Sequence, residues 1–232
     1  MPGPIGLFIW GLATALEVCF VACSLVRKSF LRYFFLNFYV VLSILASLAR
    51  FITLSYGYGL DSPEYTYTYF YSDALLTVAL YIALISLYSY IFGELGFTKQ
   101  IRFGAVVLLL GTAGFSYAVV AQSADLLSTK LAYTLSLNLY FVGLVLTYIL
   151  WGAVLKLRET RTRVVQLVLS LGIYFSAHAA SYALLDLAGK YGVVQYLGPA
   201  LGCLLPLSWS ITMMRYSEES RLAPANLVAV PR

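Results

Sequence analysis

The chain has 232 residues, of which 61% are hydrophobic and only 11% are charged. A soluble domain has roughly 45–50% apolar and about 25% charged residues, so this composition excludes a soluble enzyme or binding module and indicates an integral membrane protein. The net charge of +5 does not indicate nucleic-acid binding, because the basic residues lie in short loops between apolar runs and form no basic face outside a bilayer.

Seven windows are long and apolar enough to form a spanning helix, which needs about 20 such residues to cross about 30 Å of hydrocarbon. The first window has no charged side chain before it, which favours an uncleaved helix over a signal peptide. The fold class is therefore all-α: a polytopic membrane helix bundle over residues 1–216, followed by a short cytoplasmic tail over 217–232. We expect the seven transmembrane helices at about 5–26, 33–56, 67–92, 101–121, 131–155, 164–187 and 193–216.

The loop charges predict an orientation. Twelve basic residues lie on one side of the predicted bundle and only two, Lys130 and Lys190, lie on the other. Because the basic side of a polytopic protein is cytoplasmic, the N-terminus is expected outside and the C-terminus in the cytoplasm. The twelve residues are Arg27, Lys28, Arg32, Lys99, Arg102, Lys156, Arg158, Arg161, Arg163, Arg215, Arg221 and Arg232.

Tyrosines gather around the loop between the second and third predicted helices. Tyrosine prefers the membrane–water boundary, so these residues form an interfacial belt or, alternatively, a docking surface for a lipid, quinone or pigment. Their period-two alternation before the third helix also permits a short extended stretch. This outer aromatic rim consists of Tyr56, Tyr58, Tyr65, Tyr67, Tyr69 and Tyr71.

An arginine and an aspartate lie at matching depths in consecutive helices. Arg50 in the second predicted helix and Asp73 in the third each lie about six residues, or about 9 Å, from the outer end. Helices joined by a short loop are usually neighbours, so Arg50 and Asp73 are expected to form an ion pair. The pair serves as a structural clamp or, alternatively, as part of a gated polar site that opens outward.

Two further ionisable residues lie deep in predicted helices. Glu17 lies near the middle of the first helix and His178 slightly above the middle of the sixth. Each forms a hydrogen bond to a neighbouring helix or, alternatively, belongs to a proton relay or ligand site. The sequence has no nucleophile–base pair and no cluster of metal ligands, so neither a catalytic site nor a metal site is predicted.

The seventh predicted helix contains Pro199 and Pro206, which are expected to kink it. A kinked helix either packs against its neighbours or lines a site, as broken helices do in transporters. In the fifth predicted helix, Asn138 can form an interhelical hydrogen bond.

Short segments of the sequence resemble segments of two groups of membrane proteins. The stretch from Tyr71 to Thr77 resembles the counter-ion segment of microbial rhodopsins, but the seventh predicted helix has no lysine to bind retinal, so a retinal pigment is excluded. The aromatic run Tyr33-Phe34-Phe35, the helix arginine Arg50, the Asp73-Ala74-Leu75 entry and the aromatic stretch from Tyr88 to Phe92 are similar to those of uncharacterised bacterial seven-helix membrane proteins. That resemblance implies a multi-pass protein of the bacterial inner membrane and implies no activity.

The sequence predicts a class of function and no specific activity. The short loops favour a non-enzymatic accessory or structural subunit that packs against lipids and other membrane subunits of a larger complex. The alternative is a ligand-sensing or small-solute transport bundle with a polar site in its outer half. A lipid-modifying enzyme ranks last because no catalytic motif is found. No cofactor is predicted, and contact with a lipid, quinone or pigment stays open.

Overall fold

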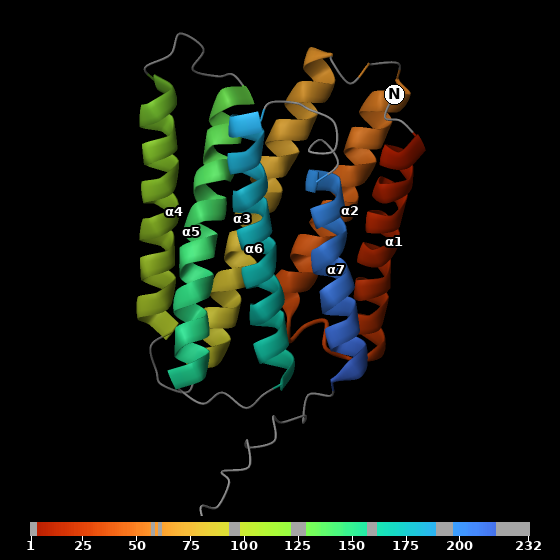
Figure 1. Cartoon of the computed structure of the whole chain (residues 1–232). Helices are drawn as coiled ribbons and strands as arrows, with labels where there is room; N and C mark the ends of the chain where they lie inside the picture. Colours follow the sequence, from red (N-terminus) through yellow and green to blue (C-terminus); the bar gives the residue numbers. More distant parts are fainter. Residues whose placement is uncertain are drawn as a thin grey trace, which may run out of the picture.

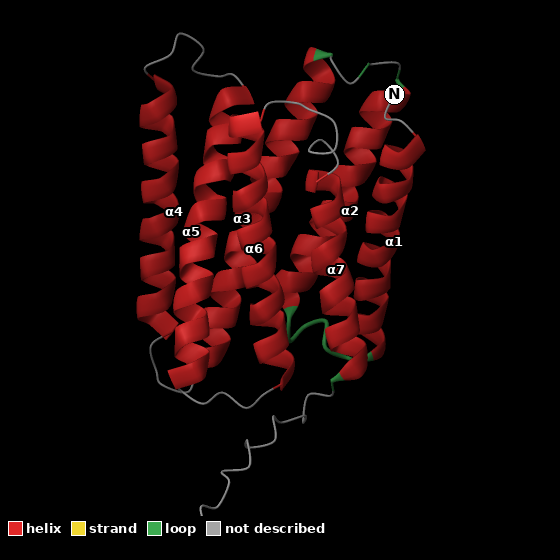
Figure 2. Ribbon diagram, viewed as in Figure 1, coloured by secondary structure: helices red, strands yellow, loops and turns green. Residues whose placement is uncertain are grey.

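The computed structural model describes residues 4–56, 59, 62–92, 98–121, 129–156, 162–188 and 197–216, and within these it does not describe the side chains of residues 4, 98, 182–188 and 197–199. The described residues form seven helices and no strand (Figures 1 and 2). Six of these helices, α1 to α6, are long and apolar enough to cross a membrane. The helices are α1 (Pro4–Val26), α2 (Phe34–Ser55), α3 (Pro63–Phe92), α4 (Thr98–Ala121), α5 (Thr129–Lys156), α6 (Thr162–Ala188) and α7 (Leu197–Arg215).

The all-α prediction with seven helices is confirmed for the described residues, but the expected start of the third helix is wrong. It begins at Pro63, so the tyrosine-rich stretch is helical and not extended. Pro63 suits the first helical position, and the hydroxyl of Ser62 accepts the Tyr65 N–H at 3.1 Å as an N-cap. Helical spacing also brings the rings into contact: their centroids are 6.3 Å apart for Tyr65–Tyr69 and 6.2 Å for Tyr67–Tyr71.

The helices run alternately up and down, and six of them close a ring. Around it, α1 packs on α2, α2 on α3, α3 on α5, α5 on α6, α6 on α7 and α7 back on α1. Helix α4 packs outside this ring against α3 and α5, whereas α3 also touches α6 across it. We call the end at which α1 begins the upper end, as it lies in Figure 1, and the opposite end the lower end.

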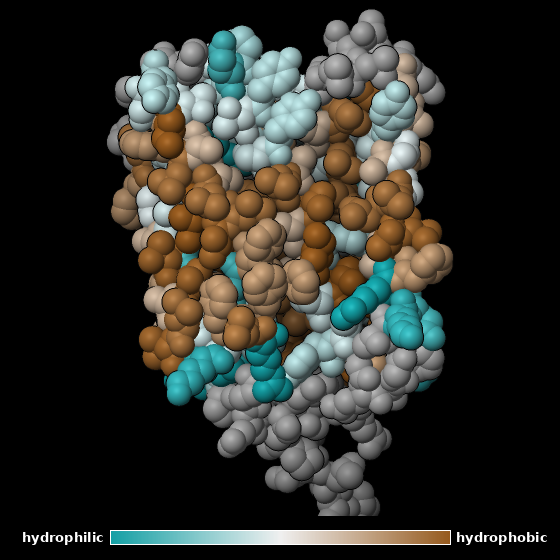
Figure 3. Space-filling model, turned by 180° about the vertical axis from the view of Figure 1, so that it is seen from behind, coloured by the Kyte–Doolittle hydropathy of each residue, from teal (hydrophilic) through white to brown (hydrophobic). Residues whose placement is uncertain are grey.

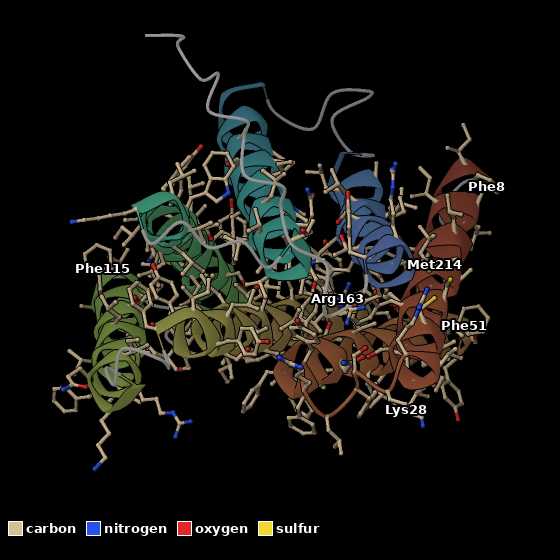
Figure 4. All side chains as sticks on the ribbon, turned by 90° about the horizontal axis from the view of Figure 1, so that it is seen from below. Phe8, Lys28, Phe51, Phe115, Arg163 and Met214 are labelled. Carbon is tan, nitrogen blue, oxygen red and sulfur yellow. The ribbon has the colours of Figure 1, made fainter. Side chains whose placement is uncertain are left out.

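The surface of the bundle has an apolar band. Figure 3 shows brown apolar side chains across the middle of one face, with paler and teal polar residues toward both ends. Seen from below in Figure 4, Phe8 and Phe115 lie on the periphery, and they are 71% and 61% exposed. In water, apolar surface of this extent would have to be covered by another protein, whereas in a lipid bilayer it is in contact with the lipid chains. The apolar band therefore agrees with the six candidate spans.

The last carbonyl groups of α7 receive arginine side chains at the lower end. Arg27 Nη2 donates to the Met214 carbonyl at 2.8 Å, and Arg163 Nε donates to the Tyr216 carbonyl at 3.0 Å. The last carbonyls of a helix have no partner within it and carry partial negative charge, so two guanidinium groups stabilise this end. Arg163 is 4% exposed, and Figure 4 shows it near the centre of the bundle as seen from below.

Hydrogen bonds also hold α4 to its neighbours. Asn138 Nδ2 on α5 donates to Ser116 Oγ on α4 at 2.9 Å, which confirms the predicted interhelical role of Asn138. Tyr81 on α3 donates from its hydroxyl to the Ala105 carbonyl at 2.9 Å. Polar contacts of this kind add specificity where two apolar helices meet.

Gly143 marks the closest approach of α5 to α6. A Cβ atom built there would lie 2.7 Å from Cζ of Phe175, a residue that is 1% exposed and closely surrounded. We therefore expect Gly143→Ala to destabilise the bundle by about 1–3 kcal/mol, because the ring has nowhere to move. Thermal melting of the purified protein in mild detergent measures the effect as a lower Tm.

Gly152→Ala on the same helix is the matched control. A Cβ there meets nothing within 4 Å, so its Tm should equal or exceed that of the parent. Equal melting of the two variants would contradict the close packing of α5 on α6.

Candidate functional site

Glu17 on α1 lies buried among the other helices, with 7% of its surface exposed. Ser43 on α2 donates its hydroxyl proton to Glu17 Oε1 at 2.6 Å, which provides the interhelical hydrogen bond that the sequence allowed. The second carboxyl oxygen, Oε2, is buried and has no hydrogen-bond partner among the described groups. A buried polar atom without a partner costs free energy, so Glu17 is a candidate functional group rather than a packing residue.

A chain of tyrosine hydroxyls lies beside this carboxyl. Tyr39 on α2, one turn below Ser43, hydrogen-bonds Tyr174 on α6, and Tyr140 on α5 is a second side-chain partner of Tyr174. The three rings are buried, with 9%, 5% and 3% of their surfaces exposed. The carboxyl of Glu17 acts electrostatically on both Tyr39 and Tyr174. Two helices, α2 and α6, therefore bring phenol groups to the Glu17 carboxyl, and α5 adds Tyr140 beside Tyr174.

His178 lies one turn above Tyr174 on α6. Its ring centroid is 4.2 Å from that of Tyr174 and 4.9 Å from that of Tyr140. The ring atom Nδ1 is buried and has no hydrogen-bond partner among the described groups. The ring of His178 stacks on Tyr174, and the expected hydrogen bond from His178 to a neighbouring helix stays a prediction.

Trp209 on α7 packs against this cluster. It is fully buried, and its ring packs against Phe20 of α1 at 5.5 Å and Tyr39 at 6.0 Å. Its Nε1 donor also has no partner among the described groups. Tryptophan N–H groups usually find an acceptor when buried, so this donor is another unmet polar atom inside the bundle.

Arg50 and Asp73 lie above the cluster. Arg50 Nε donates to Ser72 Oγ of α3 at 2.8 Å, and the guanidinium lies 4.5 Å from the centroid of the Tyr69 ring. These contacts join α2 to α3, and Ser72 directly precedes Asp73 in the chain. The carboxyl of Asp73 acts electrostatically on Tyr39, Tyr69 and Tyr174. The predicted Arg50–Asp73 ion pair stays a prediction.

The aromatic rim lies at the upper end, away from the buried cluster. Tyr56 is 80% exposed, and Tyr67 and Tyr71 are each 48% exposed, whereas Tyr58 lies outside the described residues. Tyr69 differs from its neighbours because Arg50 covers its ring. The structure thus sets one rim residue, Tyr69, beside the polar interior.

The predicted kink of α7 stays a prediction. The helix continues through Pro206, whose missing N–H leaves the Gly202 carbonyl without its usual helical partner. Pro199 lies in the first turn of α7, and the structure does not describe its side chain.

Sequence reasoning found Glu17 and His178 but missed the tyrosines between them. Tyr39, Tyr140 and Tyr174 lie well inside their helices, although tyrosine prefers helix ends at the bilayer boundary. That unusual depth is the signal that could have identified them. Their meeting depends on the ring order of the helices, with α6 placed opposite α2, which no single window of sequence shows.

The chemistry of this cluster is that of acids and hydrogen bonds. It combines a carboxyl, an imidazole and three phenols, the groups that exchange protons in proteins. Among the described residues, no group of three or more His, Cys, Asp and Glu could hold a metal ion. Comparisons with protein-family models, with curated proteins and with solved structures find no match. The resemblance to bacterial seven-helix proteins therefore stays a prediction.

The ion pair can be tested by a double-mutant cycle with Arg50→Met and Asp73→Asn. If the two side chains are paired, each single variant leaves a partly buried charge without its counterpart, and the double variant should regain about 1 kcal/mol or more relative to the sum. Melting curves in detergent of the parent and the three variants give the coupling. Additive effects would instead indicate that Arg50 interacts with Ser72 and Tyr69 and forms no ion pair with Asp73.

Proposed function

We propose that this protein is a small-solute transport or sensing bundle of the membrane, with its solute site in the polar interior around Glu17. The observation that supports this most is the Glu17 carboxyl, which is 7% exposed and bonded by Ser43 at only one of its two oxygens. Ionisable groups inside a membrane bundle are costly and are retained mainly where they bind or move something. A subunit that only packs against partners has no need of one.

We also propose that all seven helices span a bacterial inner membrane, with the N-terminus outside and the C-terminus cytoplasmic. The asymmetry of twelve basic residues against two supports this orientation. The antiparallel order of the helices in Figure 1 agrees with it, because Arg27 and Arg163 then both lie at the cytoplasmic end. In this orientation the aromatic rim and Arg50 lie toward the outside.

A C-terminal fusion tests the orientation. Green fluorescent protein fused after Arg232 should fluoresce in bacteria, whereas alkaline phosphatase fused at the same place should be inactive, because it requires export. The opposite pattern would contradict a cytoplasmic C-terminus.

Solute binding is tested by melting the purified protein with single solutes such as methylammonium, alanine, glucose and acetate. A ligand that binds only the folded state raises stability by about 2.7 kcal/mol at a hundred times its Kd. We expect at least one solute class to raise the Tm of the parent and to leave Glu17→Gln unchanged.

Glu64→Gln is the matched control, because Glu64 lies exposed in the first turn of α3 and should keep the parent's response. Failure of every class to raise the Tm, together with stable co-purification of other membrane subunits, would favour the accessory-subunit role instead. An equal response of the parent and Glu17→Gln would remove Glu17 from the solute site.

A further inference from the structure

The two cysteines of α1 lie one helical turn apart. Cys19 and Cys23 are separated by four positions, a spacing that places both side chains on one face of the helix. Their sulfur atoms are 4.0 Å apart, and neither thiol is in a disulfide. Cys19 is exposed and Cys23 is partly exposed, so the pair can be reached from outside the bundle.

The helix keeps this pair from closing into a disulfide bond. Side chains four positions apart on a helix have Cβ atoms about 5–6 Å apart, whereas a disulfide requires about 3.5–4.5 Å. The backbone N–H of Arg27 donates to the Cys23 carbonyl at 3.0 Å, so the helical hydrogen bonds continue past the pair. A disulfide would require this part of α1 to deform, and the two thiols therefore stay available as ligands.

A single metal ion fits between the two sulfur atoms. Bonds from a first-row metal ion to sulfur are about 2.3 Å long, so an ion bound nearly in line between two sulfurs holds them about 4–4.6 Å apart. The observed separation of 4.0 Å lies at the lower end of this range. Small rotations of the two side chains therefore suffice for binding, and the helix backbone stays in place.

The number and kind of ligands decide which ion fits. Zn²⁺ in a structural site takes four ligands, and among the described residues no group of three or more His, Cys, Asp and Glu could hold a metal ion. Thiolate is a soft ligand and selects soft ions such as Cu(I), which is satisfied by two thiolates in line. The pair thus suits a two-coordinate Cu(I) ion and lacks the ligands that Zn²⁺ needs.

Arg27 supplies the charge that such a complex needs. Two thiolates and one Cu(I) ion leave a single negative charge, which is costly at an apolar surface unless a cation lies nearby. Arg27 lies one turn below Cys23, and its positive charge acts on the Cys23 thiol. The guanidinium is held at this place by its 2.8 Å hydrogen bond to the Met214 carbonyl of α7.

The pair lies close to the lower end of the bundle. Cys23 lies three positions before Val26, the last residue of α1, which is about 4.5 Å along the helix axis. In the proposed orientation this end faces the cytoplasm, where thiols are kept reduced. The same reducing conditions keep copper in its Cu(I) form, so ligand and ion are both present in the state that binding requires.

We propose that Cys19 and Cys23 form a binding site for one Cu(I) ion on the surface of α1. Binding breaks the two S–H bonds, releases two protons to water and forms one bond from each sulfur to the ion, so no oxidant or reductant is needed. The site uses none of the residues around Glu17, so it stands or fails independently of the proposed solute site.

Transfer of copper from a coloured chelator tests the site. The purified full-length protein, reduced and kept free of oxygen in mild detergent, is titrated into the Cu(I) complex of bicinchoninate, whose absorbance falls as the protein takes up the ion. We expect the parent to take up one Cu(I) per chain, and we expect Cys19→Ser and Cys23→Ser to lose this uptake. X-ray absorption of the loaded parent should show two sulfur neighbours around copper.

Cys203→Ser is the matched control. Cys203 lies on α7, where its thiol donates to the Ile9 carbonyl at 3.7 Å, so this variant should bind one Cu(I) as the parent does. Cys19→Ala and Cys23→Ala repeat the test in case a serine variant melts below the parent. The site is overturned if the parent takes up no Cu(I), if either single variant on α1 takes up as much as the parent, or if X-ray absorption shows three or more sulfur neighbours.

Discussion

The hydrogen bond from Ser43 to Glu17, 2.6 Å long, joins α1 to α2 inside the bundle, and the rest of the polar interior is arranged around it. An apolar helix bundle supplies few partners for a carboxyl, and an oxygen left without one costs free energy. Ser43 satisfies one oxygen and fixes the direction of the carboxyl. The other oxygen is buried without a hydrogen-bond partner among the described groups, as are His178 Nδ1 and Trp209 Nε1.

That cluster needs α7 to close the ring. Trp209 of α7 packs on Phe20 of α1 and on Tyr39 of α2, so it joins α7 to both of these helices. The position of α7 is in turn fixed at its lower end, where the guanidinium groups of Arg27 and Arg163 bind its last carbonyls. The guanidinium groups of Arg27 and Arg163 thus have a structural role at the end of α7.

The close packing of α5 on α6 places the histidine. Gly143 lets Phe175 approach the backbone of α5, and this contact brings the α6 residues Tyr174 and His178 within reach of Tyr140. The interior is therefore closely packed where α5 meets α6.

The sequence by itself determined the helices, because the length of an apolar run and the charge of its flanks are local properties. It also located Glu17, Arg50, Asp73 and His178, since an ionisable residue in an apolar run is conspicuous. The start of α3 was missed because an alternating tyrosine pattern is compatible with strand and helix alike, and only the Ser62 cap and the ring stacks one turn apart show the helix. Only the tertiary structure decided which groups meet: Ser43 with Glu17, Tyr39 with Tyr174, and Arg50 with Ser72 and Tyr69. Those contacts join residues on different helices, and they depend on the rotation of each helix about its axis and on the order of helices in the ring, neither of which is encoded in any single span.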